Sequence, residues 1–214
     1  MHAIVNYSPS QECQYIAVGL HPIDRALIDK VAEASSVKGI VAIGEVGLDY
    51  SKRGYDASNR HIMFQELVRL VRARNLPLVI HCRDRPGASA AYEDCLRVLE
   101  SELHSTHPIY LHCFTAGKAV ARRWLRAFPG MYFGLSPKLI WGSVHAECWN
   151  VTKELHFAQM LLESDAPYLP DRTTEDCLDF NSTWSIVDVA VKVGEFFKMS
   201  PLTILKYTTQ NARE

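Results

Sequence analysis

Short apolar runs alternate with longer amphipathic stretches along this chain. The runs are rich in Val, Ile, Leu and Tyr, as buried strands are, and the segments between them are mostly long enough for a helix. This alternation predicts βα units that build a parallel sheet. The expected strands are Ala3–Tyr7, Tyr15–Leu20, Val41–Glu45, Leu78–His81, Ile109–His112, Met131–Leu135 and Met160–Ser164.

The stretches between the strands space their apolar residues as helices do. In the segment 59–74, Phe64, Leu67, Val68 and Val71 fall on one side of a helix, the pattern of a helix packed on a sheet. No linker or charge block interrupts the series, so we expect one domain over residues 1–214. The expected helices are Ile23–Ala34, Asn59–Arg74, Ser89–Leu103, Lys118–Phe128, Thr183–Phe197 and Pro201–Ala212.

Polar residues lie at or just after the carboxyl ends of most of these strands. A TIM-like (β/α) barrel gathers its functional residues on that face, and this α/β fold is the predicted class. A closed barrel of this kind has eight strands, whereas seven are recognisable here. The strand-end residues are His21, Glu45, His81, His112, Ser136 and Asp165.

Composition narrows the setting of the protein. The 214 residues are 48% hydrophobic and 22% charged, which excludes a disordered or fibrous chain. Lys and Arg number 23 against 24 Asp and Glu, so no bulk positive field marks a nucleic-acid binder, and such contact would need a local site. The six cysteines form no CxxC pair, and neither a secretory leader nor a membrane span is recognisable. We therefore expect reduced thiols, a cytoplasmic or nuclear location and no membrane partner.

Glu45, His81 and His112 are the strongest candidates for chemistry. Glu45 precedes Gly47, which permits close backbone approach, although a strand-end carboxylate also caps turns. A lone histidine on a strand is more often a hydrogen-bonded core residue than a ligand. Two histidines at equivalent strand ends beside a carboxylate form a set that suits Zn²⁺ and other first-row metals. Asp49 is a weaker candidate for a ligand than Glu45, because an Asp in a turn usually bonds to the backbone.

Further polar residues complete the candidate site. Asp165 ends the last strand and could ligate a metal or accept a proton from water, and its alternative is a turn residue before Pro167. Glu163 points to the same side of that strand and could orient a neighbour. The planar guanidinium of Arg83 could bind a phosphate oxygen, and a salt bridge to Glu163 or Asp84 is the alternative. His21 could touch a substrate or belong to a turn.

Other reactive side chains are expected to serve structure or solvent. Cys82 and Cys113 alternate away from the site and should pack as small apolar residues. The other histidines lie in terminal, helical or loop contexts and are expected to be solvated: His2, His61, His104, His107, His145 and His156.

With these motifs placed, the sequence resembles the TatD family of metal-dependent hydrolases and deoxyribonucleases, in particular its eukaryotic TatD-domain-containing branch. The resemblance runs from about Ala3 to Ala212, and Thr208-Thr-Gln-Asn-Ala212 resembles the closing helix of the family. It rests on Gly19-Leu-His-Pro22, Ile43-Gly-Glu-Val-Gly-Leu-Asp-Tyr50, Leu76-Pro-Leu-Val-Ile-His-Cys-Arg83, His112-Cys-Phe-Thr-Ala-Gly117 and Leu162-Glu-Ser-Asp-Ala-Pro-Tyr168.

The resemblance implies a TIM-like barrel that holds one or two divalent metal ions, Mg²⁺, Mn²⁺ or Zn²⁺. Glu45 corresponds to the bridging carboxylate, His81 and His112 to ligands of one ion, and Asp165 to a ligand of the other. His21 and Arg83 correspond to positions near the substrate. The implied activity is hydrolysis of DNA phosphodiester bonds, with single strands or 3′ ends as substrate.

One family motif has no counterpart here. TatD proteins begin with a His-x-His pair on their first strand, and a pair starting at His2 fails because residue 4 is Ile. We therefore expect a barrel without its first βα unit, and a chain that is also slightly truncated after its closing helix. Four side chains suit one open cation site, with Asp165 free to act as a base, better than two tightly held ions. A partner chain or an oligomer is expected to cover the open sheet edges.

Two other functions remain open at this level. The missing ligands would also suit a catalytically silent domain that binds or regulates. Similar barrels host varied chemistry, so a metal hydrolase of small amides or lactones is a third possibility.

Overall fold

The computed structural model describes residues 2–7, 14–22, 28–51, 57–140, 145–153, 155–170 and 180–214. The chain divides into two compact units. The first contains Met1–His112 and Arg123–Met131, and the second contains Cys113–Arg122 and Tyr132–Glu214. None of the helices in the described ranges is long and apolar enough to cross a membrane.

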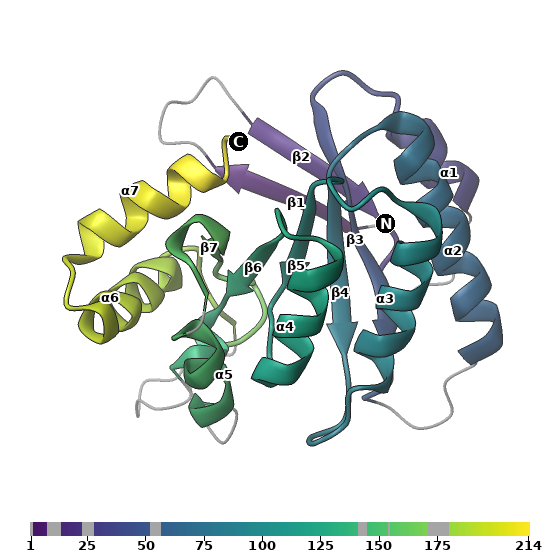
Figure 1. Ribbon diagram of the computed structural model, residues 1–214. Coiled ribbons are helices and arrows are strands. Elements are labelled where there is room, and N and C mark those ends of the chain that lie inside the picture. The colour runs from purple at the N-terminus through teal and green to yellow at the C-terminus, as the bar shows by residue number, and fades with distance from the viewer. Residues whose placement is uncertain are drawn as a thin grey trace. The chain divides into compact units, whose positions relative to one another are not determined.

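The first unit is a sheet with helices packed against it (Figure 1). Strands β2, β3, β4 and β5 are parallel neighbours in chain order, as the alternating pattern predicts. The elements are β1 (His2–Tyr7), β2 (Gln14–Gly19), α1 (Ile28–Ala34), β3 (Ile40–Asp49), α2 (Ala57–Arg74), β4 (Leu78–Arg83), α3 (Ala90–Glu102) and β5 (Ile109–His112). Helix α4 (Lys118–Ala127) has residues in both units. The part of the first expected helix that covers residues 23–27 lies outside the described residues.

Strand β1 departs from the prediction, because it pairs with β2 in the antiparallel direction. A parallel crossover needs a dozen or more residues, and only residues 8–13 separate β1 from β2. The apolar pattern locates both strands but carries no information on their direction. The expectation of a wholly parallel sheet is therefore wrong at this strand.

Strand β3 is longer than predicted and does not end at Glu45. It continues to Asp49 through a bulge, since Ile43 pairs with Leu78 but Val46 pairs with Ile80. Between these two pairs β3 has one residue more than β4, which reorients the intervening side chains. Glu45 lies in this bulge, so it is a residue of the strand interior rather than of a turn.

The helices of the first unit cover the sheet with the residues that the helical spacing selects. Phe64, Leu67, Val68 and Val71 of α2 are all buried, as are Tyr92, Leu96 and Leu99 of α3. The ring of Tyr92 meets that of Trp124 edge to face, with centroids 6.5 Å apart. This core fixes the strands whose ends carry the candidate site.

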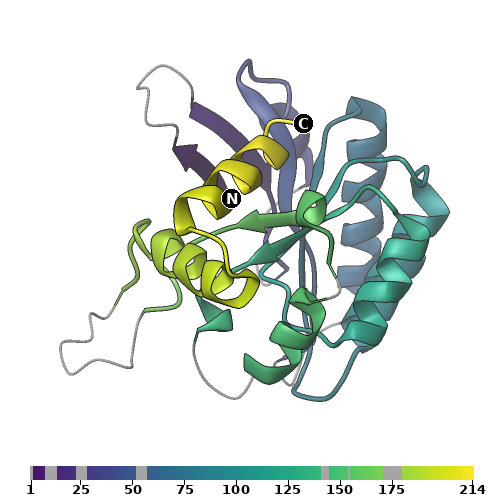
Figure 2. The ribbon, with the colours of Figure 1, turned by 60° about the vertical axis from the view of Figure 1, so that its left-hand side comes forward.

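The second unit carries the remaining strands and the last two helices. Strand β6 runs parallel to β7, and α6 packs against α7, as Figures 1 and 2 show. The Asn211 side chain of α7 donates hydrogen bonds to the carbonyls of Phe157 and Met160, which ties this helix to the start of β7. The elements are β6 (Tyr132–Leu135), η1 (Pro137–Leu139), α5 (His145–Thr152), η2 (Phe157–Gln159), β7 (Met160–Leu162), α6 (Ser185–Phe197) and α7 (Pro201–Asn211).

Candidate metal centre

Three adjacent strands of the first unit bring three of the four predicted ligands together, Glu45, His81 and His112. His81 of β4 pairs directly with His112 of β5, and on the other side it pairs with Gly47 of β3. The close fit of β3 against β4 depends on that glycine, because a Cβ at Gly47 would collide with the carbonyl oxygen of His81. Glu45 therefore lies within side-chain reach of both histidines.

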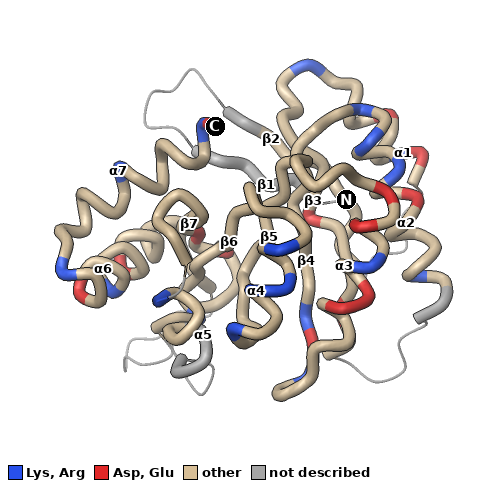
Figure 3. The backbone as a smooth tube through the Cα atoms, viewed as in Figure 1, with Lys and Arg blue, Asp and Glu red and all other residues tan. Residues whose placement is uncertain are grey.

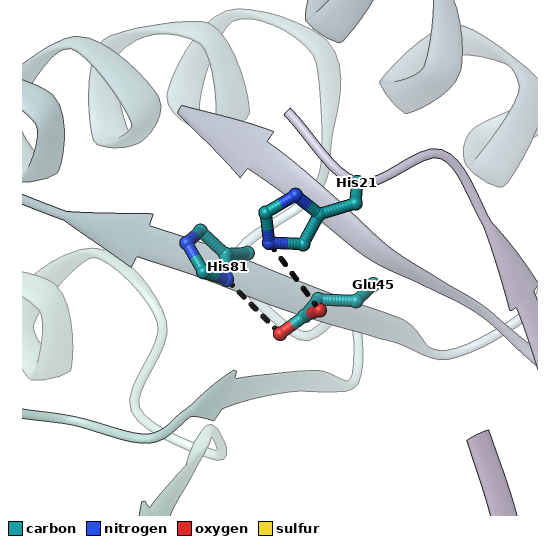
Figure 4. A group of neighbouring side chains, drawn as sticks. All are labelled: His21, Glu45 and His81. Carbon is teal, nitrogen blue, oxygen red and sulfur yellow. Dashed lines mark hydrogen bonds and ion pairs between the residues drawn. The ribbon is translucent and has the colours of Figure 1, made fainter. Parts of the chain in front are cut away.

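The Glu45 carboxylate is the centre of the cluster. Its Oε2 lies 3.0 Å from Nδ1 of His81 and 2.8 Å from Nε2 of His112. Its Oε1 lies 3.8 Å from Nε2 of His21, and Figure 4 shows the contacts with His21 and His81. All four side chains are at most 15% exposed, so water screens these contacts poorly.

These contacts determine the charge of Glu45. Burial by itself would raise the pKa of the carboxyl group. Hydrogen bonds and electrostatic attraction from His112 and His81 outweigh burial, so the pKa of Glu45 lies far below its ordinary range. Glu45 is consequently a carboxylate at neutral pH, the form that can bind a cation.

His21 contacts Glu45 and His81 directly, whereas the sequence suggested only a substrate contact or a turn role for it. It follows β2, and its ring centroid is 4.4 Å from that of His81, edge to face. Ligand atoms of His21, Glu45 and His81 all fall within 4.8 Å of one another, the spacing of a group that can hold a metal ion. A Cβ at Gly19 would clash with the backbone of Gly44, so this glycine permits the approach of β2 to β3.

The donor set of the cluster fits a divalent metal ion. Imidazole nitrogens and a buried carboxylate are the ligands that Zn²⁺ and neighbouring first-row ions prefer. Glu45 is negatively charged, and the rings of His21, His81 and His112 surround it within 3.8 Å. Glu45, His81 and His112 are thus brought together as predicted, and whether they bind a metal stays a proposal.

Asp49 lies beside this cluster at the end of β3, whereas its sequence context favours a turn. It is the last residue of β3, is 4% exposed, and its Oδ2 lies 3.5 Å from Nε2 of His81. Burial would raise its pKa, but the contact with His81 and the hydrogen bond from Ser51 lower it below the ordinary range. The sequence signal for this contact is the motif Gly47-Leu48-Asp49. Residues two apart on a strand point to the same side, and Gly47 is the residue that packs against the His81 backbone.

Arg83 ends β4, next to Asp49 in the strand register. Its backbone carbonyl accepts a hydrogen bond of 2.8 Å from the amide of Tyr50. No ion pair joins its guanidinium group to another residue of the described ranges, so the alternative of a salt bridge to Glu163 or Asp84 is not observed there. Asp84 instead accepts a hydrogen bond from the amide of Ala91 at the start of α3. The substrate role of Arg83 stays a prediction.

Asp165 and Glu163 lie in the second unit, after β7. Asp165 adopts a left-handed backbone with φ of 56°, and its carbonyl accepts a hydrogen bond from the Tyr168 amide. The Glu163 carboxylate accepts a hydrogen bond of 2.6 Å from the amide of Cys113, and its orienting role stays a prediction. The membership of Asp165 in the cation site stays a prediction.

Several other predicted side chains can be placed. Cys82 and Cys113 are buried, as expected, and the Cys113 thiol lies 3.2 Å from the Ser136 hydroxyl. His104 and His156 are exposed, as expected, while the side chains of His2 and His145 lie outside the described residues.

The expectation of solvated histidines is wrong for His61 and His107. His61 contacts the Tyr50 hydroxyl and lies 3.4 Å from Asp94. His107 is half-buried against the carbonyl of Leu76, and burial lowers its pKa. Both residues meet segments distant in sequence, which local context could not reveal.

Comparison with known proteins relates the whole chain to one family. The family model for the TatD related DNases matches residues 2–214. The chain is 30% identical to an uncharacterized metal-dependent hydrolase, YabD, of Bacillus subtilis over 93% of this chain and 76% of that protein. It is 32% identical to a 3′-5′ ssDNA/RNA exonuclease, TatD, of Cronobacter turicensis over 72% of this chain and 57% of that protein.

Two further proteins extend the comparison. The human 3′-5′ RNA nuclease TATDN2 is 30% identical over 73% of this chain, which spans 20% of that longer protein. The crystal structure of the TatD homologue YJJV of Escherichia coli superposes with a TM-score of 0.76 at 21% identity, covering 92% of this chain and 74% of that one. This likeness confirms the predicted TIM-like α/β fold class. The chain therefore belongs to the TatD related DNase family of metal-dependent hydrolases.

Proposed function

We propose that this chain is a nuclease that hydrolyses DNA phosphodiester bonds with the help of one or two divalent metal ions. The observation that carries the proposal is the buried Glu45 carboxylate, which lies between His81 and His112 and faces His21. The family supports a metal-dependent hydrolase, and the exonuclease relative acts on single-stranded DNA and RNA. This substrate would place the protein in the cytoplasm or the nucleus.

Glu45, His81 and His112 would hold the cation, with Asp165 as a further ligand. A divalent ion bound there supplies Lewis acidity, which makes water a stronger nucleophile at neutral pH and offsets the charge of a phosphate. Mg²⁺, Mn²⁺ and Zn²⁺ all accept oxygen or nitrogen donors, and the histidine-rich set favours Mn²⁺ or Zn²⁺ over Mg²⁺. His21 would add an imidazole either to this ligand set or to the substrate contacts.

The remaining residues would handle the proton and the substrate. The Asp165 carboxylate would accept the proton of the attacking water. Arg83 would bind a nonbridging phosphate oxygen, since two N–H groups of a guanidinium match two acceptors of a phosphate. Glu163 would hold the backbone at Cys113 through the hydrogen bond already described, and so would act on the site only indirectly.

A cleavage assay on labelled single-stranded DNA tests this proposal. The wild type is compared with Glu45→Gln, which keeps the size of the side chain and removes its charge, and with Glu66→Gln, an exposed carboxylate of α2, as a matched control. With Mn²⁺, Zn²⁺ or Mg²⁺ present we expect cleavage by the wild type and by the control. We expect cleavage by Glu45→Gln to be slower by at least about 100-fold, because the variant lacks the negative charge that would hold the cation. Each factor of ten in rate corresponds to about 1.4 kcal/mol of lost transition-state stabilisation. EDTA should abolish the activity.

The other outcomes separate the alternative functions. Metal-dependent binding of DNA without cleavage would identify a silent binding domain. Hydrolysis of lactone or amide substrates without cleavage of DNA would identify a different metal hydrolase. A parallel assay on RNA decides whether the substrate class is wider than DNA.

A further inference from the structure

Asp49 is a buried carboxylate beside the proposed metal centre, and neither cation binding nor substrate binding has yet been assigned to it. As the last residue of β3 it pairs with Arg83, two positions beyond the pair formed by Gly47 and His81. Its Oδ1 accepts a hydrogen bond of 2.8 Å from the Ser51 amide. This bond anchors the carboxylate and leaves Oδ2 directed toward the His81 ring, 3.5 Å from Nε2.

The two nitrogens of His81 face different carboxylates. Nδ1 lies 3.0 Å from Oε2 of Glu45, the oxygen that also contacts His112, and Figure 4 draws this contact beside His21. Nε2 is buried on the opposite side of the ring and has no hydrogen-bond partner in the part of the chain that the structure describes. Of the carboxylates in those ranges, only Glu45 and Asp49 lie within 4.0 Å of the ring nitrogens.

The proton on a neutral imidazole determines which nitrogen can donate its lone pair to a cation. With the proton on Nε2, the lone pair of Nδ1 is directed toward Glu45 and the other imidazoles. With the proton on Nδ1, no lone pair is available on that side. A carboxylate near Nε2 favours the first tautomer, because it accepts the Nε2 proton in a hydrogen bond.

We infer that Asp49 is a positioning residue of the metal centre. It holds the Nε2 proton of His81 and thereby presents the unprotonated Nδ1 atom to a cation shared with Glu45 and His112. The gap of 3.5 Å closes to a hydrogen bond when this tautomer is populated, and the buried orphan nitrogen gains the partner that it lacks. The inference rests on the metal centre of the proposed function and is independent of which bond the enzyme cleaves.

The tautomer can be measured directly in the wild-type protein. With ¹⁵N-histidine labelling and Zn²⁺ as a diamagnetic probe, long-range ¹H–¹⁵N correlation spectra distinguish the two forms of each ring, and His81→Asn identifies the His81 signals. We expect the Zn²⁺-loaded protein to carry the His81 proton on Nε2. A proton on Nδ1 would overturn the inference, and this measurement does not require a variant of Asp49 that folds.

The second measurement is metal affinity. Asp49→Asn keeps the shape of the side chain, removes its charge and places an amide near Nε2. Competition with a chromophoric chelator should show Zn²⁺ affinity lower by about 10- to 100-fold, the usual effect of losing the hydrogen-bond partner of a ligating histidine. Asp84→Asn is the matched control. Asp84 is a carboxylate after the neighbouring strand, its hydrogen bond goes to the start of α3, and the variant should bind Zn²⁺ within about twofold of the wild type.

A double-mutant cycle shows whether Asp49 acts through His81. In a His81→Asn background, Asp49→Asn should cause little further loss of Zn²⁺ affinity, because the ring that it positions is absent. An equal loss in both backgrounds would overturn the inference, as would an unchanged affinity in Asp49→Asn alone. Neither measurement uses DNA, so a failed nuclease assay with the expected tautomer and coupling would refute the proposed substrate and leave the role of Asp49 intact.

Discussion

At the scale of single residues, the cluster concentrates its interactions on one oxygen atom. Oε2 of Glu45 meets both His81 and His112, and three imidazoles surround a single negative charge. Because these side chains are at most 15% exposed and contact one another closely, cation binding would cost little reorganisation. The same burial makes the protonation state of Glu45 important for stability.

The first prediction concerns this protonation at low pH. Since the folded state lowers the pKa of Glu45, the carboxylate adds stability at pH values above its unfolded pKa of about 4.5, and this contribution is lost as the pH falls below that value. Glu45→Gln mimics the protonated form and lacks this dependence. In EDTA, the difference in unfolding free energy between wild type and Glu45→Gln should shrink as the pH is lowered from 7 to 3.

Urea denaturation at each pH measures this difference. Glu66→Gln, an exposed carboxylate, provides the control and should follow the wild type throughout. A wild-type and Glu45→Gln difference that stays constant over this range would show that the histidines do not stabilise the charged form of Glu45.

At the scale of elements, β3 determines the geometry of the site. Its bulge places Glu45 in the strand interior, and the missing side chain of Gly47 lets β3 approach the His81 backbone. Gly47 also has a φ of 153°, a conformation that residues with a Cβ rarely adopt. The bulge and the glycine together fix both the ligands and Asp49.

Gly47→Ala should therefore disrupt the sheet at the metal centre. The new Cβ would overlap the His81 carbonyl oxygen, and relieving the clash would separate β3 from β4. We expect the free energy of unfolding to fall by about 3 kcal/mol or more, because the substitution combines a strained backbone conformation with overpacking. Thermal unfolding followed by circular dichroism measures the change. Gly130→Ala, where nothing lies within 4 Å of the added Cβ, should stay within about 1 kcal/mol of the wild type.

A second group of side chains ties the end of β3 to two helices. The Tyr50 hydroxyl donates a hydrogen bond of 2.9 Å to Asp94 of α3 and also contacts His61 of α2. Tyr50→Phe should lower the free energy of unfolding by about 1–3 kcal/mol, because Asp94 loses one of its hydrogen-bond donors and keeps Arg97. Urea unfolding tests this value. Tyr207→Phe is the control, since the Tyr207 hydroxyl has no partner within the described ranges, and equal costs at both positions would contradict the role of the Tyr50 contacts.

The extent to which the sequence predicts this arrangement follows from what each pattern encodes. Helical spacing correctly selects Phe64 and Val68 for the core, because burial on one face is a local property. Strand direction and length are not local, so the antiparallel β1 and the continuation of β3 to Asp49 were missed. His61 was missed for a related reason, since its partners lie on other elements.

At the scale of the whole molecule, the charges balance and many are already paired. The chain has 23 Lys and Arg against 24 Asp and Glu, and Figure 3 shows both signs interspersed along α1, α2 and α3. Arg69 and Arg72 of α2, for example, both pair with Glu102 of α3. The near-neutral total charge provides no bulk positive field, so we expect affinity for a phosphate backbone to come from a cation at the proposed metal centre and from local cations. Arg83 is one such cation, since its guanidinium forms no ion pair within the described ranges.

The near-neutral charge of the chain predicts how DNA binding depends on salt. A single-stranded oligonucleotide with noncleavable linkages should bind in Mn²⁺ with an affinity that depends only weakly on KCl concentration. The slope of log affinity against log salt concentration is about −0.7 per phosphate contact, and we expect few such contacts. Fluorescence anisotropy should show affinity falling more than about tenfold in EDTA. Arg83→Ala should make this slope less negative by about 0.7, the value of one phosphate contact. Arg69→Ala removes a cation already paired with Glu66 and Glu102 and should leave the slope unchanged. Tight binding in EDTA with a steep slope would mean that a positive surface outside the proposed metal centre provides the affinity.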